Sequence, residues 1–120
     1  MNQLQNNYDL EERTAVFGES IIEFCRGVGQ DIITKPIINQ LVRSGTSIGA
    51  NYMKANGASS KKDFRNKVFI CKKESQESKH WLRMLASALP EMAAEFRKLW
   101  QEAQEFTLIF QKIAKSSGTS

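Results

Sequence analysis

The sequence contains few residues that interrupt or cross-link a chain. Its 120 residues include only two cysteines, two prolines and seven glycines. Two cysteines are too few for a disulfide framework, and so few prolines and glycines favour long elements over many short strands. The sequence shows no signal peptide, and no apolar run approaches the roughly 18–20 residues that span a membrane. These absences predict a cytoplasmic protein with reduced cysteines and no membrane segment.

The overall composition is typical of one small globular domain, which we expect to span residues 1–120. The composition is 41% hydrophobic and 25% charged, and the formal net charge is +4. That charge is unevenly distributed, because residues 1–30 carry a net −3 and residues 54–83 a net +6. We therefore expect any electrostatic function to reside in residues 54–83.

Apolar residues recur at alternating spacings of three and four in four stretches, which is the period of an amphipathic helix. Ser60 with Asp63 is a helix-start signal, and Asn56 followed by Gly57 is a stop signal. The sequence predicts helices over about 9–28, 35–56, 60–88 and 90–115. With short connections, these predict an all-α antiparallel up-and-down four-helix bundle. The small residues at 44–50 predict a close approach between helices.

Basic residues form a column on the helix predicted over 60–88. Arg65, Lys72 and Lys79 recur every seven residues, about 10.5 Å apart along a helix. Clustered Lys and Arg residues are typical of nucleic-acid binders, although a solvated helix face is an equally simple interpretation. Few aromatic residues interleave with this column, so base stacking is not expected there. Further candidate residues for the same surface are Lys54, Lys61, Lys62 and Lys73.

Several large apolar residues fall outside the predicted helix seams. Large apolar side chains on more than one helix suggest a subunit interface. The alternative is that Trp81 and Trp100 flank the core of their own chain. The candidate interface residues are Phe69, Ile70, Trp81, Trp100 and Leu108.

No arrangement of residues predicts catalysis or metal binding. Glu77 and His80 have the Glu-x-x-His spacing of di-iron bundles, but His80 is the only histidine and both residues fall on the outer side of their helix. The sequence also lacks a nucleophile elbow and a phosphate-binding loop. We therefore predict a protein that is not an enzyme and that holds no metal or cofactor.

Three segments carry a family resemblance. LVRSGTSIGANYMKANGASSKKDF (41–64), FICKKESQESKHWLRML (69–85) and QEAQEFTLIFQKI (101–113) resemble the bacterial four-helix-bundle proteins encoded in intervening sequences of large-subunit ribosomal RNA. The resemblance spans about residues 10–115 and implies a cytoplasmic homopentamer. The biochemical role of these family members is not established.

A more distant resemblance is to the accessory variability protein of diversity-generating retroelements, a pentameric bundle. This resemblance implies nucleic acid and a reverse transcriptase as partners. The basic positions that match the family pattern are Arg43, Lys61, Lys62, Lys72 and Lys73.

Two functions from different classes are therefore open. The first is a non-enzymatic oligomeric bundle that binds the RNA or DNA backbone through its basic face. The second is a protein-interaction adaptor or scaffold with no direct role in nucleic-acid binding.

Overall fold

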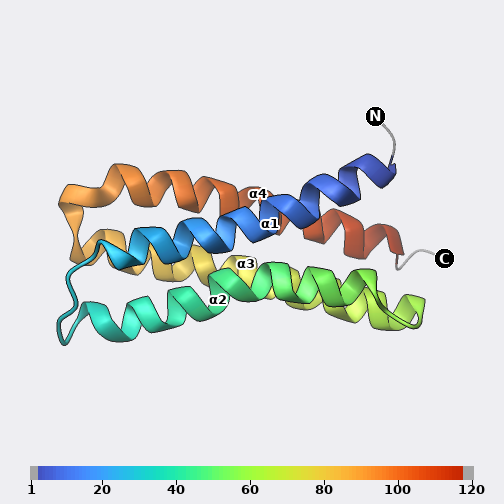
Figure 1. Cartoon of the computed structure of the whole chain (residues 1–120), viewed down its shortest axis with the longest axis horizontal. Coiled ribbons are helices and arrows are strands. Elements are labelled where there is room, and N and C mark those ends of the chain that lie inside the picture. Colours follow the sequence, from blue (N-terminus) through green and yellow to red (C-terminus); the bar gives the residue numbers. More distant parts are fainter. Residues whose placement is uncertain (1–2, 118–120) are drawn as a thin grey trace.

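The computed structural model describes residues 3–117, and none of these residues lies in a strand. In chain order the elements are α1 (Gln3–Arg26), α2 (Thr34–Asn56), α3 (Lys61–Ala88), the short 3-10 turn η1 (Pro90–Met92) and α4 (Ala93–Ser117). Successive helices run antiparallel, so the start of α1 and the end of α4 lie at the same end of the bundle (Figure 1). The predicted all-α four-helix bundle is thereby confirmed.

The four helices surround one core, and each packs against its neighbours in the chain. α1 also packs against α4, which leaves α1 diagonally opposite α3. The bundle measures 47 × 27 × 20 Å. None of the described helices combines the length and the apolar character that a membrane span requires.

The helix boundaries follow local capping chemistry. Ser60 precedes α3 in an extended conformation, and its Oγ accepts a hydrogen bond from the backbone N–H of Asp63 at 3.0 Å. Before α2, the Asp31 carboxylate accepts hydrogen bonds from the backbone N–H groups of Thr34 and Ile33, at 2.8 and 2.9 Å. These donors lower the pKa of Asp31. The Ser60 cap was predicted from the sequence, whereas the Asp31 cap was not.

Two helices begin at other residues than the sequence predicted. α1 begins at Gln3 rather than near residue 9, since no proline or glycine lies between to stop it. Pro90 opens the 3-10 turn, and α4 itself begins at Ala93. Proline fixes its own φ and lacks an N–H, which suits the start of such a turn.

The core contains the seam residues of each helix. On α3 the buried positions follow the predicted spacing of three and four, including two serines; they are Val68, Cys71, Ser75, Ser78, Leu82 and Leu85. The Ser78 hydroxyl donates to the Ser44 hydroxyl of α2 at 2.9 Å, so these buried polar groups are satisfied within the core.

Glycines let α1 and α2 approach each other closely. A Cβ built on Gly45 would stand 3.0 Å from Cγ1 of Ile21, and one on Gly49 would stand 3.3 Å from Oγ1 of Thr14. A larger residue at either position would require the facing residue or the helix itself to shift. The prediction of a close approach at residues 44–50 agrees with this geometry.

Large aromatic side chains fill the space between α1 and α4. Phe17 meets Phe106 edge-on with 5.5 Å between ring centroids, and Phe24 meets Phe96 at 4.6 Å. Such edge-to-face pairs stabilise the contact by about 0.5–1.5 kcal/mol beyond the burial of their area. Outside the rings, Arg13 of α1 binds two carboxylates of α4, which therefore face α1.

Candidate nucleic-acid interface

The acidic side chains of helix α3 and most of its basic side chains lie on different sides of the helix. Lys79 bonds to Gln104 of α4, whereas Glu74 and Glu77 bond to Arg43 of α2, which identifies the side that adjoins each neighbour. Helical spacing places no carboxylate on the side of α3 toward α4 and solvent. We call this side the α3 cationic face; it comprises Lys62, Arg65, Lys72, Lys73, Lys79 and Arg83.

All three acidic residues of α3 form ion pairs on the opposite side. Asp63 pairs with Lys67 one turn along the helix at 3.5 Å. Glu74 lies 3.0 Å from Nη1 of Arg43, and Glu77 contacts Nη2 of the same guanidinium. The carboxylates are therefore neutralised away from the α3 cationic face, which keeps its full positive charge.

Arg43 was a candidate nucleic-acid-binding residue, and the structure places it apart from the others. Its guanidinium is bound by two carboxylates between α2 and α3. These two ion pairs neutralise the positive charge that would otherwise be available to bind a phosphate. Sequence spacing on one helix could not reveal this pairing, because Arg43 is 31 and 34 residues away from its partners.

Lys79 of α3 contacts two residues of α4. Its Nζ donates to Oε1 of Gln104 at 2.5 Å and stands 5.2 Å from the centroid of the Trp100 ring. Neither partner is charged, so the ammonium keeps its positive charge beside an aromatic ring. Few aromatic residues were expected near the basic column, but α4 supplies Trp100 from outside α3.

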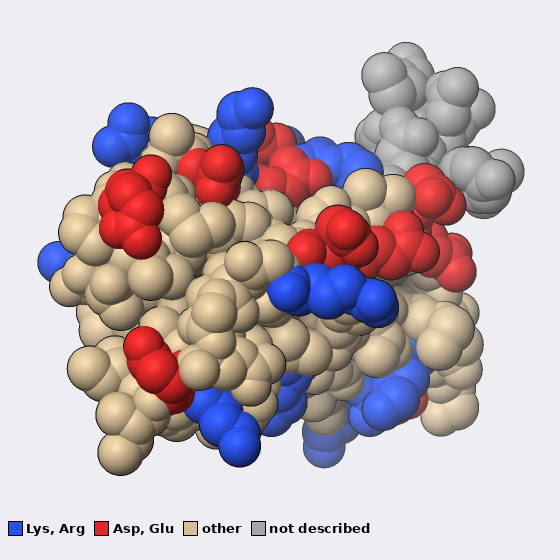
Figure 2. All heavy atoms as spheres, turned by 60° about the vertical axis from the view of Figure 1, so that its left-hand side comes forward, with Lys and Arg blue, Asp and Glu red and all other residues tan. Residues whose placement is uncertain are grey.

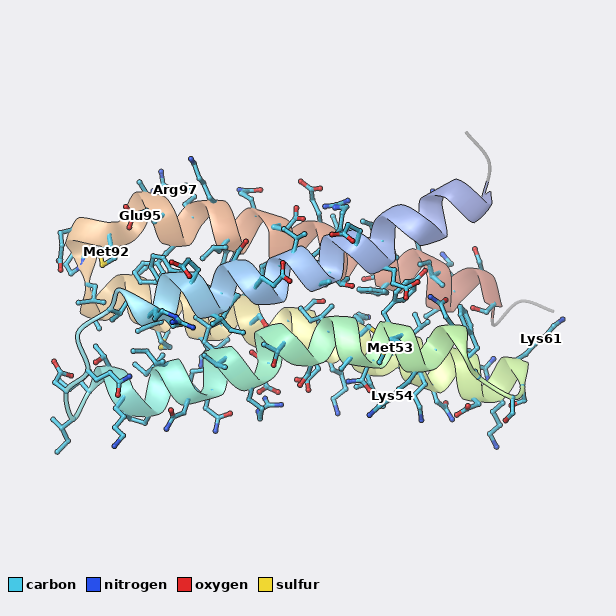
Figure 3. The ribbon with its side chains drawn as sticks, in the orientation of Figure 1. Met53, Lys54, Lys61, Met92, Glu95 and Arg97 are labelled. Atoms are coloured by element: carbon cyan, nitrogen blue, oxygen red, sulfur yellow. The ribbon has the colours of Figure 1, made fainter. Side chains whose placement is uncertain are left out.

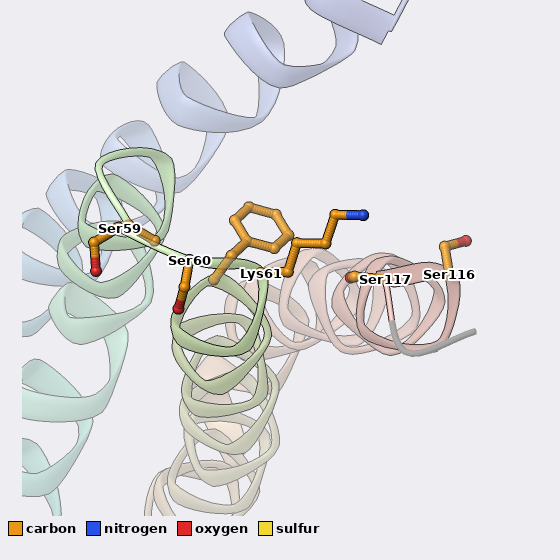
Figure 4. Close-up of a pocket in the computed structure, with 7 residues that line it drawn as sticks. Ser59, Ser60, Lys61, Ser116 and Ser117 are labelled. Carbon is orange, nitrogen blue, oxygen red and sulfur yellow. The ribbon is translucent and has the colours of Figure 1, made fainter. Parts of the chain in front are cut away.

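The other predicted basic residues lie at one end of the bundle. Lys54 extends from the outer side of α2, and Lys61 projects beyond the start of α3 (Figure 3). Lys61 also lines a hollow of about 560 Å³ whose wall includes Phe64 and Ser117 (Figure 4). Lys61 therefore extends the α3 cationic face, whereas Lys54 stands apart on α2.

Two arginines that were not among the predicted binding residues lie at the opposite end. Arg83 on the last turns of α3 and Arg97 near the start of α4 line one cleft. Both side chains are exposed, and Arg97 lies on the outer edge of α4 (Figure 3). Arg83 lies four residues after Lys79, one helical turn further along the same side of α3, so its position was open to prediction. The position of Arg97 could not be predicted, because it depends on the register between α3 and α4.

The predicted interface residues fall into two groups. Trp81 and Trp100 are half-buried and pack against the core, as expected for aromatic residues that flank it. Phe69 and Leu108 are exposed, by 45% and 55%. Ile70 is half-buried. Phe69 lies within one turn of Arg65 and Lys72, so this one candidate interface residue adjoins the α3 cationic face.

Charge is also unevenly distributed over the whole molecule. In the view of Figure 2, most of the acidic side chains lie in the upper half of the bundle, which α1 and α4 form, and several Lys and Arg side chains lie among them (Figure 1). The lower edge, which α2 and α3 form, carries mostly Lys and Arg side chains. A polyanion would therefore be attracted most strongly to the lower side.

The residues that could take part in metal or redox chemistry either make other contacts or are buried. Glu77 binds Arg43 and accepts the indole N–H of Trp81, while His80 is exposed beside the Trp81 ring. Within residues 3–117, no group of three or more His, Cys, Asp or Glu side chains is placed to hold a metal ion. Burial raises the pKa of the Cys25 thiol to about 11. It raises that of Cys71 to about 12.

Comparison with known proteins identifies the family of this chain. The model of the 23S rRNA-intervening sequence protein family matches residues 7–112. A crystal structure from Bacteroides thetaiotaomicron, described as a protein with unknown function from the S23 ribosomal protein family, superposes with a TM-score of 0.79. It is 25% identical, and the match covers 91% of this chain and 97% of that one. No curated protein matches the chain. With most of its length matched by one family model, this chain belongs to the 23S rRNA-intervening sequence protein family.

Proposed function

We propose that this protein binds the phosphate backbone of RNA or DNA through the α3 cationic face and has no enzymatic activity. One observation carries the proposal: the acidic residues of α3 are all paired on the side toward α2, while every charged residue on its other side is a lysine or an arginine. Within the part of the chain that the structure describes, none of the six cations on this face forms an ion pair. A solvated helix usually interleaves both signs of charge, whereas this one separates them.

The dimensions of the face suit a polyanion. Arg65 and Arg83 are separated by 18 positions, which corresponds to about 27 Å along a helix. That length spans several successive phosphates, so three or more contacts with one strand are possible at once. Contacts to phosphates release counterions but read no base, and we expect strong salt dependence with little sequence preference.

The test is a titration of a labelled RNA hairpin and a DNA duplex at about 50 and 200 mM salt. Each phosphate contact should contribute nearly one unit to the slope of log affinity against log salt concentration. The variant Lys72→Glu/Lys73→Glu removes the middle of the face. Its matched control is Lys98→Glu/Lys112→Glu, which makes the same change in net charge at exposed positions on α4. The first variant should lose most of the affinity and the control little. Equal losses, or affinity that does not depend on salt, would contradict the proposal.

We further propose that the protein assembles with itself in the cytoplasm, as a homopentamer. The exposure of Phe69 and Leu108 supports an interface of this kind, since large apolar side chains on a surface favour association. Light scattering tests it directly: a mass five times that of the 13.6 kDa chain is expected. A monomeric mass would remove the reason for these exposed residues.

The second candidate is an adaptor that binds a partner protein, such as a reverse transcriptase, through acidic side chains of that partner. It is favoured by the same exposed Phe69, because a protein partner would cover an apolar side chain that lies among cations. Purification from a nuclease-treated lysate distinguishes the two functions. A retained, stoichiometric protein partner without nucleic acid would favour the adaptor.

A further inference from the structure

A cleft of about 320 Å³ opens between the last turns of α3 and the first turns of α4. Its floor is apolar and includes the buried side chains of Leu82 and Phe96. Its rim carries Arg83, Arg97 and Gln101, and the half-buried ring of Trp100 forms part of its wall. We call this site the Arg83–Arg97 cleft. Its volume is at the lower end of the roughly 300–1,000 Å³ typical of small-molecule sites, which suits one planar group.

The polar groups of the cleft are available to a ligand. Within the described part of the chain, no hydrogen bond or ion pair engages the guanidinium groups of Arg83 and Arg97 or the amide of Gln101. The indole N–H of Trp100 makes no hydrogen bond there either. Because no buried side-chain nitrogen or oxygen in the described residues lacks a partner, this N–H is accessible to solvent. An apolar floor with a few convergent donors is the usual composition of a ligand site.

The charge of the cleft favours an anion. None of its lining residues is a carboxylate. Glu102 is held by Arg13 on the α1 side of α4, and Glu95, seven residues before it, falls on that same side. Arginine prefers phosphate or carboxylate groups, which it binds through two parallel N–H donors.

The cleft is also continuous with the α3 cationic face. Lys79 stands over the ring of Trp100, with its Nζ 5.2 Å from the ring centroid, and thereby links the cleft wall to the basic column. A strand whose phosphates follow Lys72 and Lys79 would thus arrive at the cleft. At that point it meets an aromatic ring and an apolar floor, which bind a base rather than a phosphate.

We propose that the Arg83–Arg97 cleft holds one unpaired base of a nucleic-acid strand, with the flanking phosphates bound by Arg83 and Arg97. This inference rests on the proposed function and adds a preference to it. A base within a continuous duplex is stacked on both faces and cannot enter, whereas a single strand, bulge or loop presents unstacked bases. The protein therefore distinguishes unpaired from fully paired nucleic acid without reading its sequence.

The test compares a single-stranded RNA with a duplex that has the same number of phosphates. Arg97→Gln removes a rim cation at an exposed position, and Lys98→Gln is its control, since it removes an equal charge from the adjacent residue outside the cleft. Trp100→Leu removes the ring, and Trp100→Phe keeps an aromatic surface. Because Trp100 also packs against the core, circular dichroism must first show that each of these two variants folds.

A fluorescence readout isolates the ring itself. In a Trp81→Phe background Trp100 is the only tryptophan, so its emission reports contact with a base. We expect the single strand to quench this emission and the duplex to leave it unchanged. Trp100→Leu should weaken single-strand binding about tenfold, and Trp100→Phe much less. Arg97→Gln should weaken it about three- to tenfold, with Lys98→Gln near wild type.

The outcomes separate this proposal from the proposed function. If single strand and duplex bind equally, without quenching, while Lys72→Glu/Lys73→Glu abolishes binding, the cleft proposal is wrong and the proposed function stands. If neither nucleic acid binds, both are wrong. If a glutamate-rich peptide quenches Trp100 as strongly as the single strand, the cleft accepts acidic chains in general, and the proposal that it holds a base is overturned.

Discussion

Gly45 of α2 lies directly against Ile21 of α1, with no space for a methyl group between them. A Cβ on Gly45 would stand 3.0 Å from Cγ1 of Ile21 and 3.3 Å from its Cγ2. Ile21 is fully buried, so it cannot move aside into solvent. The contact therefore sets how closely the backbones of α1 and α2 approach.

Substitution of Gly45 by alanine should destabilise the protein. Alanine gains roughly 0.5–1 kcal/mol of helix propensity, but overpacking of a closed site costs about 1–3 kcal/mol. We expect a net loss of about 1 kcal/mol in the free energy of unfolding, measured by denaturant titration. The control is Gly29→Ala, since a Cβ on Gly29 meets nothing within 4 Å. A Gly45→Ala variant as stable as the Gly29→Ala variant would show that α1 and α2 can separate freely.

Sequence periodicity predicted the elements that depend on local chemistry. The seam of α3 and the Ser60 cap involve residues at most four positions apart, so one helix contains all the information needed. The Asp31 cap is equally local, since its partners are two and three positions away, and it was open to prediction from the same signal as the Ser60 cap. The pairing of Arg43 with Glu74 was not, because the two residues meet only when α2 and α3 are packed in register.

The candidate site shows the same division. The basic column along α3 could be read from heptad spacing, because Lys72 and Lys79 are seven residues apart. Its aromatic neighbour could not, since Trp100 reaches Lys79 from another helix. Arg97 was missed for the same reason, and no spacing within α4 marks it.

Substitution of Arg43 by glutamine should change nucleic-acid binding less than substitution of Lys72. Arg43 is paired with Glu74 and Glu77, whereas Lys72 has no ion pair within residues 3–117. We expect less than about a twofold loss of affinity for Arg43→Gln and about three- to tenfold for Lys72→Gln at low salt. The stability of Arg43→Gln should fall by about 1 kcal/mol or less, because the Arg43 side chain is 45% exposed and solvent screens its ion pairs. A larger affinity loss for Arg43→Gln would mean that nucleic acid displaces the carboxylates.

The two buried thiols should be unreactive in the folded protein. Their pKa values, about 11 for Cys25 and about 12 for Cys71, leave roughly a thousandth or less as thiolate at pH 8. An aromatic disulfide reagent should therefore label neither native thiol within minutes and both in denaturant. Rapid labelling of one thiol in the native state would indicate local opening around that helix.

The same thiols should lower stability at alkaline pH. Unfolded cysteines ionise near their ordinary pKa of 9.0, whereas the folded ones stay protonated until about pH 11 and 12. Above pH 9 the unfolded chain therefore binds fewer protons, and the free energy of unfolding falls as pH rises toward 11. Denaturant midpoints at pH 8 and 10 measure the fall. It should be smaller in Cys25→Ala/Cys71→Ala, which has no such thiols to titrate.

Salt should act in opposite directions on self-association and on nucleic-acid binding. Association through Phe69 would bring together chains that each carry a net charge of +4, and salt screens that repulsion. We expect the mass measured by light scattering to rise with salt, while nucleic-acid affinity falls. Phe69→Gln should abolish the rise. Val16→Gln is the matched control, because Val16 is exposed by the same 45%. A mass that falls with salt would place the interface elsewhere.

The diagonal placement of α1 and α3 has a consequence for approach at long range. The exposed side chains of Glu12, Glu19 and Glu23 are on α1, and the α3 cationic face lies on the opposite corner of a bundle only 20–27 Å thick. The molecule is thus an electric dipole across its short axis. In the field of a polyanion it would turn α3 forward before any contact forms, which raises the association rate most at low ionic strength.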